Sequence, residues 1–490
     1  MTPFLDLGFP KRAIKAILHR AQITPNMLAA EPDSFPRAIE SILPNDEVCR
    51  KNLVESYLQH RGITPSKISF TANPWDNLSL SDRIAQATEA LGTGKRLLLL
   101  IYERECGDTG TFRYFGYNVY QRLIESDCWH GTILFIDELE NALEIIERSS
   151  AISLIRCRIR PELVRLAELA KQRDIPIAYT MDDDALGTSK AAHIIDLMAN
   201  NPDDPFERAF WTGVTHRFQL AADLTDAFFA PSAYYARILE DEQRKPAFVT
   251  HSSLNDEQIA VLRAIQSTAK AKHDDSAFIV GYFSGTSSHQ SDFALVRDAI
   301  IQFLSEHDDA RLLLCGKLLI DQQLYTLYQH GQIILLPLVD YATLQYVQSS
   351  VDVSLAPLVV NAFTNCKSGL KVFEAGAVGV PSCASPAFAY QEAIKHGETG
   401  FICGTNQEWL EALNTLYRDR NLTERMGKAA KSRSLNMYYG NAIREEIEHA
   451  CNQLQACKCE PIPNHVYNEL EGKAELDWDN PFISNPAFAD

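Results

Sequence analysis

Residues 361–381 of this chain read NAFTNCKSGLKVFEAGAVGVP. Lys367, Lys371 and Glu374 are spaced i, i+4 and i+7, so on a helix they share one face near its start. The macrodipole and the unpaired N–H groups of a helix start favour an anion, and two lysines add positive charge. A carboxylate one turn further on can accept two hydrogen bonds from a ribose diol. The stretch therefore predicts a phosphate-binding helix in a sugar-nucleotide pocket, with a solvated helix face as the simpler alternative.

The same stretch is rich in glycine, with Gly369, Gly376 and Gly379 among its small and apolar residues. A surface helix rarely carries so many glycines, and glycine permits close approach of a backbone to a ligand. Around this stretch, short apolar runs separated by helical segments predict strands. These runs are 277–283, 311–315, 332–336, 353–356, 380–384 and 401–403.

A second set of apolar runs lies earlier in the chain, at 96–102, 132–136, 152–155, 175–180 and 227–230. Helical periodicity falls between them, in 114–125, 138–148 and 161–173. Continuous apolar strands that alternate with helices imply buried parallel sheets. We therefore expect the α/β class, with two doubly wound Rossmann-like domains that face a cleft and are joined by a polar linker at about 250–275.

The domain boundaries follow from these patterns. Residues 1–92 read as an extra helical N-terminal module, with helices at 11–22, 36–43, 46–60 and 82–91 and Ser81 as N-cap of the last. Residues 93–250 form the first Rossmann-like domain and residues 251–442 the second. A helix at 443–454 and an acidic, proline-broken, loosely ordered tail make up residues 443–490.

The bulk composition narrows the classes of function. The chain has 490 residues and a formal net charge of −18, which argues against general binding to nucleic acid or to anionic membranes. No run approaches the roughly 18 to 20 apolar residues that cross a bilayer, and the first residues do not resemble a secretory leader. We expect a cytoplasmic protein, in which the eleven cysteines are reduced core thiols.

Two clusters could suggest a metal. Cys451, Cys457 and Cys459 do not have the spacing of a zinc site. Asp182, Asp183 and Asp184 follow a predicted strand, at the edge where ligands collect in open α/β sheets. A metal-binding aspartate cluster is one interpretation. We favour carboxylates that face acceptor hydroxyls or hold a loop, and we expect no metal.

Three further segments carry candidate residues. Ser284, Gly285 and Thr286 follow the strand at 277–283, where backbone N–H groups could reach a pyrophosphate or simply form a turn. His289, with Asp292, could bind ligand or cap the next helix. In the glycine-rich stretch 107–114, Arg113 could reach a phosphate or carboxylate in the cleft, or lie on the surface. The stretch lacks the G-x-G-x-x-G order of a dinucleotide site.

These segments resemble a bacterial branch of the family 4 glycosyltransferases, which are retaining enzymes with the GT-B fold. The resemblance covers roughly residues 94–450. It is carried by GYFSGTSSHQSDF at 281–293, ARLLLCGK at 310–317, DVSLAP at 352–357, the stretch 361–381, and YTMDDD at 179–184.

The resemblance implies transfer of a sugar from a nucleotide diphosphate sugar to a hydroxyl acceptor, with retention and without a metal or other cofactor. The acceptor would be a glycan, a lipid-linked molecule or a protein, with peripheral membrane contact possible and polysaccharide biosynthesis as the setting. It assigns Lys367 and Lys371 to the leaving diphosphate and Glu374 to the ribose. The other implied residues are Ser284, Gly285, Thr286, His289, Lys317, Asn365, Ser368, Gly369 and Leu370 for the donor, and Thr111, Arg113 and Asp183 for the acceptor.

Two departures from the family pattern bear on this assignment. Cys366 stands where the first of two glutamates is usual, and Thr286, Ser287 and Ser288 occupy a loop that is commonly basic. Lys317, Lys367 and Lys371 would then balance the diphosphate charge. Two alternatives stay open: a nucleotide-sugar epimerase or hydrolase of the same fold, and a non-catalytic binding or scaffold subunit.

Overall fold

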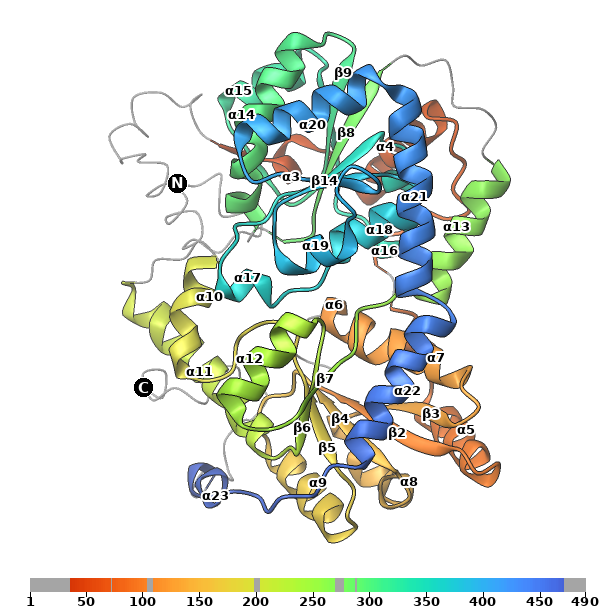
Figure 1. The fold of residues 1–490 in the computed structure, drawn as a ribbon, viewed down its shortest axis with the longest axis vertical. Coiled ribbons are helices and arrows are strands. Elements are labelled where there is room, and N and C mark those ends of the chain that lie inside the picture. Colours follow the sequence, from red (N-terminus) through yellow and green to blue (C-terminus); the bar gives the residue numbers. More distant parts are fainter. Residues whose placement is uncertain are drawn as a thin grey trace.

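Two six-stranded sheets, parallel throughout, form the frame of the chain (Figure 1). The computed structural model describes residues 36–71, 73–103, 109–197, 203–268, 277–286 and 289–470. Each sheet is buried on both faces because helices cover it, as its continuous apolar strands require. The expectation of two doubly wound Rossmann-like domains is therefore confirmed.

The first sheet has the strand order β3-β2-β4-β5-β6-β7. Its strands are β2 (Arg96–Tyr102), β3 (Trp129–Phe135), β4 (Ala151–Ile155), β5 (Ile177–Thr180), β6 (Ala227–Ala230) and β7 (Ala247–Val249). The helices of this domain are α6 (Thr109–Phe112), α7 (Asn118–Ile124), α8 (Leu143–Glu147), α9 (Pro161–Gln172), α10 (Ala191–Leu197), α11 (Pro205–Asp223) and α12 (Ala233–Gln243). A π-helical turn, Arg113–Tyr117, joins α6 to α7.

The second sheet has the order β11-β9-β8-β12-β13-β14. Its strands are β8 (Phe278–Ser284), β9 (Ala310–Gly316), β11 (Ile333–Leu336), β12 (Val353–Ala356), β13 (Ser382–Ala384) and β14 (Gly400–Ile402). Its helices are α14 (Gln290–Glu306), α15 (Gln322–Gln329), α16 (Tyr341–Ser349), α17 (Ala362–Asn365), α18 (Leu370–Ala377), α19 (Phe388–Ala393), α20 (Asn406–Arg418) and α21 (Arg420–Tyr438).

The strand orders locate the ligand-binding edge of each sheet. In chain order, the six parallel strands of the second sheet lie as 3-2-1-4-5-6, so the order reverses between β8 and β12. In the first sheet it reverses between β2 and β4. Open α/β sheets bind ligands outside the carboxyl ends of their strands at such switch points. The segments after β8 and β12, and after β2 and β4, are therefore the places to seek a site.

The described part of the N-terminal segment is shared between the two domains. Strand β1 (Arg37–Ala38) pairs antiparallel with β10 (Leu319–Ile320) of the second domain. The short helix α3 (Ile39–Ile42) and the longer α4 (Glu47–His60) pack against that domain's core. Helix α5 (Leu80–Gly92) packs instead on the first sheet. Residues 36–92 thus form no separate helical module, and the helix expected at 11–22 lies outside the described residues.

Two local expectations differ from the structure. The Ser79 side chain, and not that of Ser81, caps α5 by accepting from the Asp82 N–H at 3.1 Å. The region expected to be a polar linker contains α13 (Asp256–Thr268), whose apolar face packs against both domains. Amphipathic periodicity in a polar stretch was the signal that the linker interpretation overlooked.

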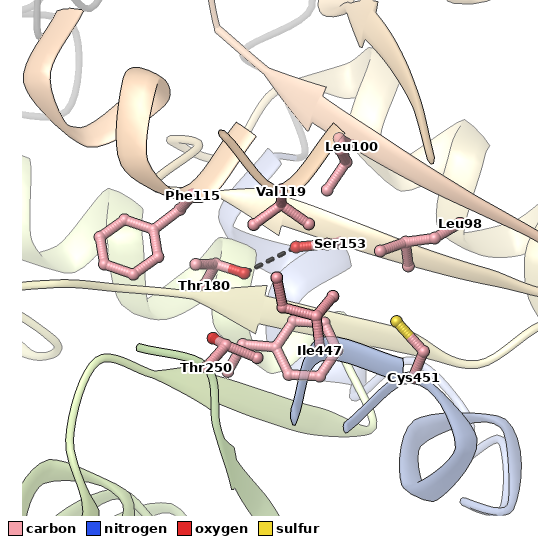
Figure 2. A pocket seen from close by; sticks show the side chains of 10 residues that line it. Leu98, Leu100, Phe115, Val119, Ser153, Thr180, Thr250, Ile447 and Cys451 are labelled. Carbon is pink, nitrogen blue, oxygen red and sulfur yellow. Dashed lines mark hydrogen bonds between the residues drawn. The ribbon is translucent and has the colours of Figure 1, made fainter. Parts of the chain in front are cut away.

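The C-terminal helix α22 (Asn441–Gln455) returns to the first domain, and the short α23 (Asn464–Leu470) follows it (Figure 1). Ile447 and Cys451 of α22 face Leu98 and Leu100 of the first sheet around a small apolar cavity (Figure 2). The cavity measures about 10 Å³, which is room for at most one water molecule. It is a packing defect rather than a ligand site. No described helix is long and apolar enough to span a membrane.

Candidate functional site

A cavity of about 550 Å³ lies between the two domains, at the carboxyl ends of both sheets. Residues of both domains line it, as the switch points predict. The cavity brings together most of the residues that the sequence singled out. These are Thr111, Arg113, Asp183, Ser284, Gly285, Thr286, His289, Lys367, Ser368, Leu370, Lys371 and Glu374.

Three expected donor residues do not line the cavity. The Lys317 backbone N–H donates to the Ser284 carbonyl at 2.8 Å, so the backbone of this residue holds the turn after β8. The Asn365 side chain accepts from the Phe388 N–H at 3.0 Å and fixes the start of α19. A Cβ on Gly369 would approach the Ala389 carbonyl oxygen to 3.2 Å, so this glycine admits α19.

The other two glycines of the stretch 361–381 also have structural roles. A Cβ on Gly376 would meet the Ser434 hydroxyl of α21 at 2.2 Å. Gly379 has a φ of +84°, a backbone conformation that residues other than glycine rarely adopt. The interpretation that these glycines let the backbone approach a ligand is therefore wrong. Gly369 and Gly376 let helices approach one another, and Gly379 allows the positive φ that follows α18.

The segment around the two lysines is not one continuous helix. Helix α17 ends at Asn365 and α18 begins at Leu370, with a turn between them that contains Lys367. Lys371 lies in the first turn of α18, while Lys367 reaches the cavity from the turn. Glycine at position 369 disfavours helix continuation, which explains the break. The expected shared helix face is wrong, although both lysines do reach the cavity.

Lys371 is the most unusual group in the cavity. Its Nζ is buried and has no hydrogen-bond partner among the described residues. It lies 5.0 Å from the centre of the Tyr282 ring. Burial lowers the pKa of Lys371 to about 8, with Asp292 opposing that shift and the charge of Lys367 adding to it. A buried ammonium without a partner is costly unless a ligand supplies the missing anion.

Asp292, the carboxylate whose charge acts on Lys371, already has hydrogen-bond partners. Its Oδ2 lies 2.8 Å from Nδ1 of His289, and its Oδ1 accepts from the Val359 N–H at 2.8 Å. Burial lowers the pKa of His289 to about 4, and Lys371 contributes, so this imidazole is neutral at pH 7. Ser284 donates its hydroxyl to the Thr286 carbonyl at 2.9 Å. These contacts shape the turn after β8 and leave the Lys371 ammonium without a hydrogen-bond partner among the described residues.

Lys367 pairs across the cavity with the first domain. Its Nζ donates to Asp183 Oδ1 at 2.6 Å, and Arg156 lies 3.5 Å from the other Asp183 oxygen. Burial alone would raise the pKa of Asp183, but the charges of Lys367 and Arg156 hold it below its usual value. Asp183 therefore joins the two domains as a carboxylate.

Glu374 makes a second contact across the cavity. Its Oε1 accepts from the Tyr114 hydroxyl and from Gln258 Nε2, the latter at 3.0 Å. Arg113 lies 3.9 Å from the same oxygen and stacks between the rings of Tyr114 and Tyr341. Arg113 is therefore no surface residue. The π-helical turn places Arg113 and Tyr114 toward Glu374, and such turns are frequent at functional sites.

The aspartates after β5 are held by basic and hydroxyl side chains. Asp182 accepts from Thr111 Oγ1 at 2.7 Å and from Arg156 at 3.4 Å, and Asp184 pairs with Lys190 at 2.9 Å. Within the described ranges, no group of three or more His, Cys, Asp or Glu side chains is placed to hold a metal ion. The expectation that the reaction needs no metal stays a prediction.

Sequence reasoning missed several lining residues of the first domain. Arg156 directly follows β4, and position at the carboxyl end of a strand was a signal that could have found it. Trp211 and Phe218 line the cavity from α11. No local pattern marks them, because their role depends on how α11 packs over the sheet.

Comparison with known proteins adds a match to the second domain. Residues 266–433 match the sequence profile of the family described as glycosyl transferases group 1. No curated protein matches the chain by sequence. The matched region contains β8 to β14 and the residues around Lys371, and it does not extend to the first sheet.

Solved structures of low sequence identity also align with the chain. HepE of Anabaena in complex with UDP is 16% identical over 73% of this chain and 100% of its own, with a TM-score of 0.48. Sucrose-phosphate synthase of Thermosynechococcus elongatus is 15% identical over 74% and 100%, with a TM-score of 0.49. A glycosyltransferase of Rickettsia africae is 13% identical over 74% and 99%, with a TM-score of 0.49. By sequence, the second α/β domain is thus similar to the glycosyl transferases of group 1.

Proposed function

We propose that this protein transfers a glycosyl group from a nucleotide diphosphate sugar to a hydroxyl acceptor. The observation that carries the proposal is Lys371 in the first turn of α18, a buried ammonium with no hydrogen-bond partner in the described part of the chain. It lines a cavity of about 550 Å³, a size that suits a small organic ligand. The sequence match of the same domain to the glycosyl transferases of group 1 supports this choice of ligand.

The chemistry requires stabilisation of a departing diphosphate. Fixed positive charge and helix dipoles in a site that excludes water supply it, as they do for other developing anions. Lys371 would bind the diphosphate together with the N-terminal end of α18. Lys367 would join it by leaving Asp183, and Glu374 would bind the ribose by leaving Tyr114. Closure over the donor then keeps water from hydrolysing it.

Retention at the anomeric carbon, membership of family 4 and independence from a metal rest on the resemblance alone, and we include them as parts of the proposal. The acceptor is a glycan, a lipid-linked molecule or a protein on the same basis. A cytoplasmic location and a role in polysaccharide biosynthesis likewise stay predictions.

Thermal shift with UDP, ADP and GDP, each against its nucleoside, tests the donor site. We expect at least one diphosphate to raise Tm and its nucleoside to have a much smaller effect, because a ligand stabilises the state that binds it. Lys371→Met should abolish the diphosphate effect. Lys431→Met is the matched control, since Lys431 is a partly buried lysine of α21 that does not line the cavity. Equal shifts in both variants would contradict the proposal.

Binding without transfer is the second candidate, favoured by Cys366. This thiol is 1% exposed, bonds to the Ala362 carbonyl at 3.3 Å and does not line the cavity. It cannot act in place of the carboxylate that the family pattern has there. The sugar conjugates of the nucleotide that raises Tm are then incubated with the protein, with and without an acceptor. Chromatography of the products separates transfer, hydrolysis and binding without turnover. Transfer needs an acceptor, hydrolysis proceeds without one, and a binding subunit consumes no donor.

A further inference from the structure

We infer that the acceptor presents a pyranose ring, which binds against Trp211 on the first-domain wall of the cavity. The inference rests on the proposed function, because it names the acceptor class of the same site. It follows from the arrangement of an apolar surface, a polar edge and an indole N–H that has no hydrogen-bond partner among the described residues.

The apolar surface comes from the loop after β5 and from helices α10 and α11. Ala185, Ile194, Trp211 and Phe218 line the cavity together, and the first two are almost fully buried. Phe218 is 6% exposed, and the Arg156 guanidinium lies 5.8 Å from the centre of its ring. Trp211 is more accessible than these neighbours. Trp211 thus provides most of the accessible apolar area on this wall, and Phe218 supports it from the same helix.

The polar edge belongs to the same wall. Thr111, Arg156 and Asp182 form one hydrogen-bonded group, in which the Asp182 carboxylate accepts from the other two. Carboxylate, guanidinium and hydroxyl groups all form hydrogen bonds with the hydroxyls of a sugar. A pyranose has apolar C–H faces and a rim of hydroxyls, and therefore matches both parts of the wall. A saturated acyl chain would offer the carboxylate no donor.

The unpartnered donor is the indole of Trp211. Its Nε1 is buried and has no hydrogen-bond partner among the described residues. Indole N–H groups donate only, and they usually find an acceptor when buried. A hydroxyl or ring oxygen of a sugar supplies that acceptor, whereas a hydrocarbon does not. Trp211 therefore combines stacking with one directional bond.

Saturation-transfer NMR tests this inference without requiring turnover. The probes are the methyl α-glycosides of glucose, galactose, mannose and N-acetylglucosamine, with dodecyl phosphate as the lipid-like probe. We expect at least one glycoside to receive saturation on the C–H protons of one ring face. Trp211→Ala should reduce that signal at least fivefold, and Trp211→Phe, which keeps a ring but lacks the N–H, about twofold.

Phe206→Ala is the matched control, because Phe206 is an aromatic residue of the same helix that does not line the cavity. It should retain the full signal, and cooperative melting of each variant checks its folding. Absence of any glycoside signal that depends on Trp211 overturns the inference, as does binding of dodecyl phosphate alone. The nucleotide thermal shift is a separate readout: its absence in a protein that still contacts the glycosides would reject the proposed transfer rather than the sugar contact.

Discussion

The two walls of the cavity differ in how their charges are balanced. On the first-domain wall, Asp182 and Asp183 are bonded to Thr111, Arg156 and Lys367. On the second-domain wall, the ammonium of Lys371 is buried without a hydrogen-bond partner among the described residues. The two aspartates of the first wall have cationic partners without a ligand, whereas no described residue accepts a hydrogen bond from the ammonium of the second wall. The difference indicates that the anion of the donor binds to the second wall.

The comparison between Lys367 and Lys371 gives the largest expected effect. Lys371→Met should lower turnover about 100- to 1,000-fold, since it removes charge stabilisation of the leaving diphosphate. The same variant should raise the free energy of unfolding of the free protein by about 1 to 3 kcal/mol, because it removes a buried charge from which no described residue accepts a hydrogen bond. Denaturant unfolding and initial rates at saturating donor measure the two effects.

Lys367→Met is the informative counterpart. It should lower the free energy of unfolding by about 1 to 2 kcal/mol, because Asp183 loses the cation at 2.6 Å and keeps the more distant Arg156 at 3.5 Å. The two lysine variants should therefore change stability in opposite directions. A loss of stability in both, or normal turnover in Lys371→Met, would remove the distinction between the two walls.

The pH dependence of donor binding gives the next largest effect. With a pKa of about 8, Lys371 loses its proton above that pH, so diphosphate affinity should fall by up to tenfold per pH unit between 8 and 9.5. In the unfolded chain the lysine titrates near 10.4, so the unfolded state binds more protons between pH 8 and 10.4. The contribution to stability consequently rises with pH over that window. Calorimetric titration of diphosphate into wild type and Lys371→Met at several pH values measures the fall in affinity. If both proteins show the same dependence on pH, a group other than Lys371 causes it.

The sequence predicted the strands of the two sheets better than it predicted the site. Continuous apolar runs predicted the strands Arg96–Tyr102, Ala227–Ala230 and Val353–Ala356 with the bounds that the structure has. They succeed because a buried parallel strand is apolar on both faces. The same runs gave no sign of the short strands β1 and β10. Two residues are too few to form a pattern.

The candidate site was predictable where a residue follows a strand or starts a helix, and not where tertiary contacts decide. Lys371, Ser284 and Asp183 belong to the first group. The contact between Tyr114 and Glu374 joins residues 260 positions apart, and Trp211 reaches the cavity through the packing of α11. No spacing rule within one segment could reveal either. The break before α18 was missed because an i, i+4 spacing was taken to imply one helix.

A smaller effect should follow from releasing Glu374. Tyr114→Phe removes one of the two hydrogen bonds to Glu374 Oε1, so the carboxylate is freer to bind the ribose. A hydrogen bond to a charged group contributes about 1.5 to 3 kcal/mol, and in the wild type part of this energy is lost when the ribose displaces Tyr114. Without that bond, we expect diphosphate binding to be about 3- to 10-fold tighter.

Tyr117→Phe is the matched control, since Tyr117 bonds Glu257 across the domains at 2.6 Å and does not line the cavity. It should leave diphosphate affinity unchanged in the same calorimetric titration. Weaker binding in Tyr114→Phe would show that Tyr114 assists the ligand, and that Glu374 acts as a domain contact rather than a ribose acceptor.

The smallest expected effects come from alanine substitutions that compare a glycine in the cavity wall with a glycine between helices. Gly369→Ala should lower the free energy of unfolding by about 1 kcal/mol, because the new Cβ presses on the Ala389 carbonyl, and should not change diphosphate affinity. Gly285 lines the cavity, and a Cβ there would have no neighbour within 4 Å. Gly285→Ala should therefore leave stability within about 0.5 kcal/mol and weaken diphosphate binding, since its methyl group occupies ligand space. Thermal melts and titrations of both variants decide this, and the reverse pattern would return Gly369 to the donor site.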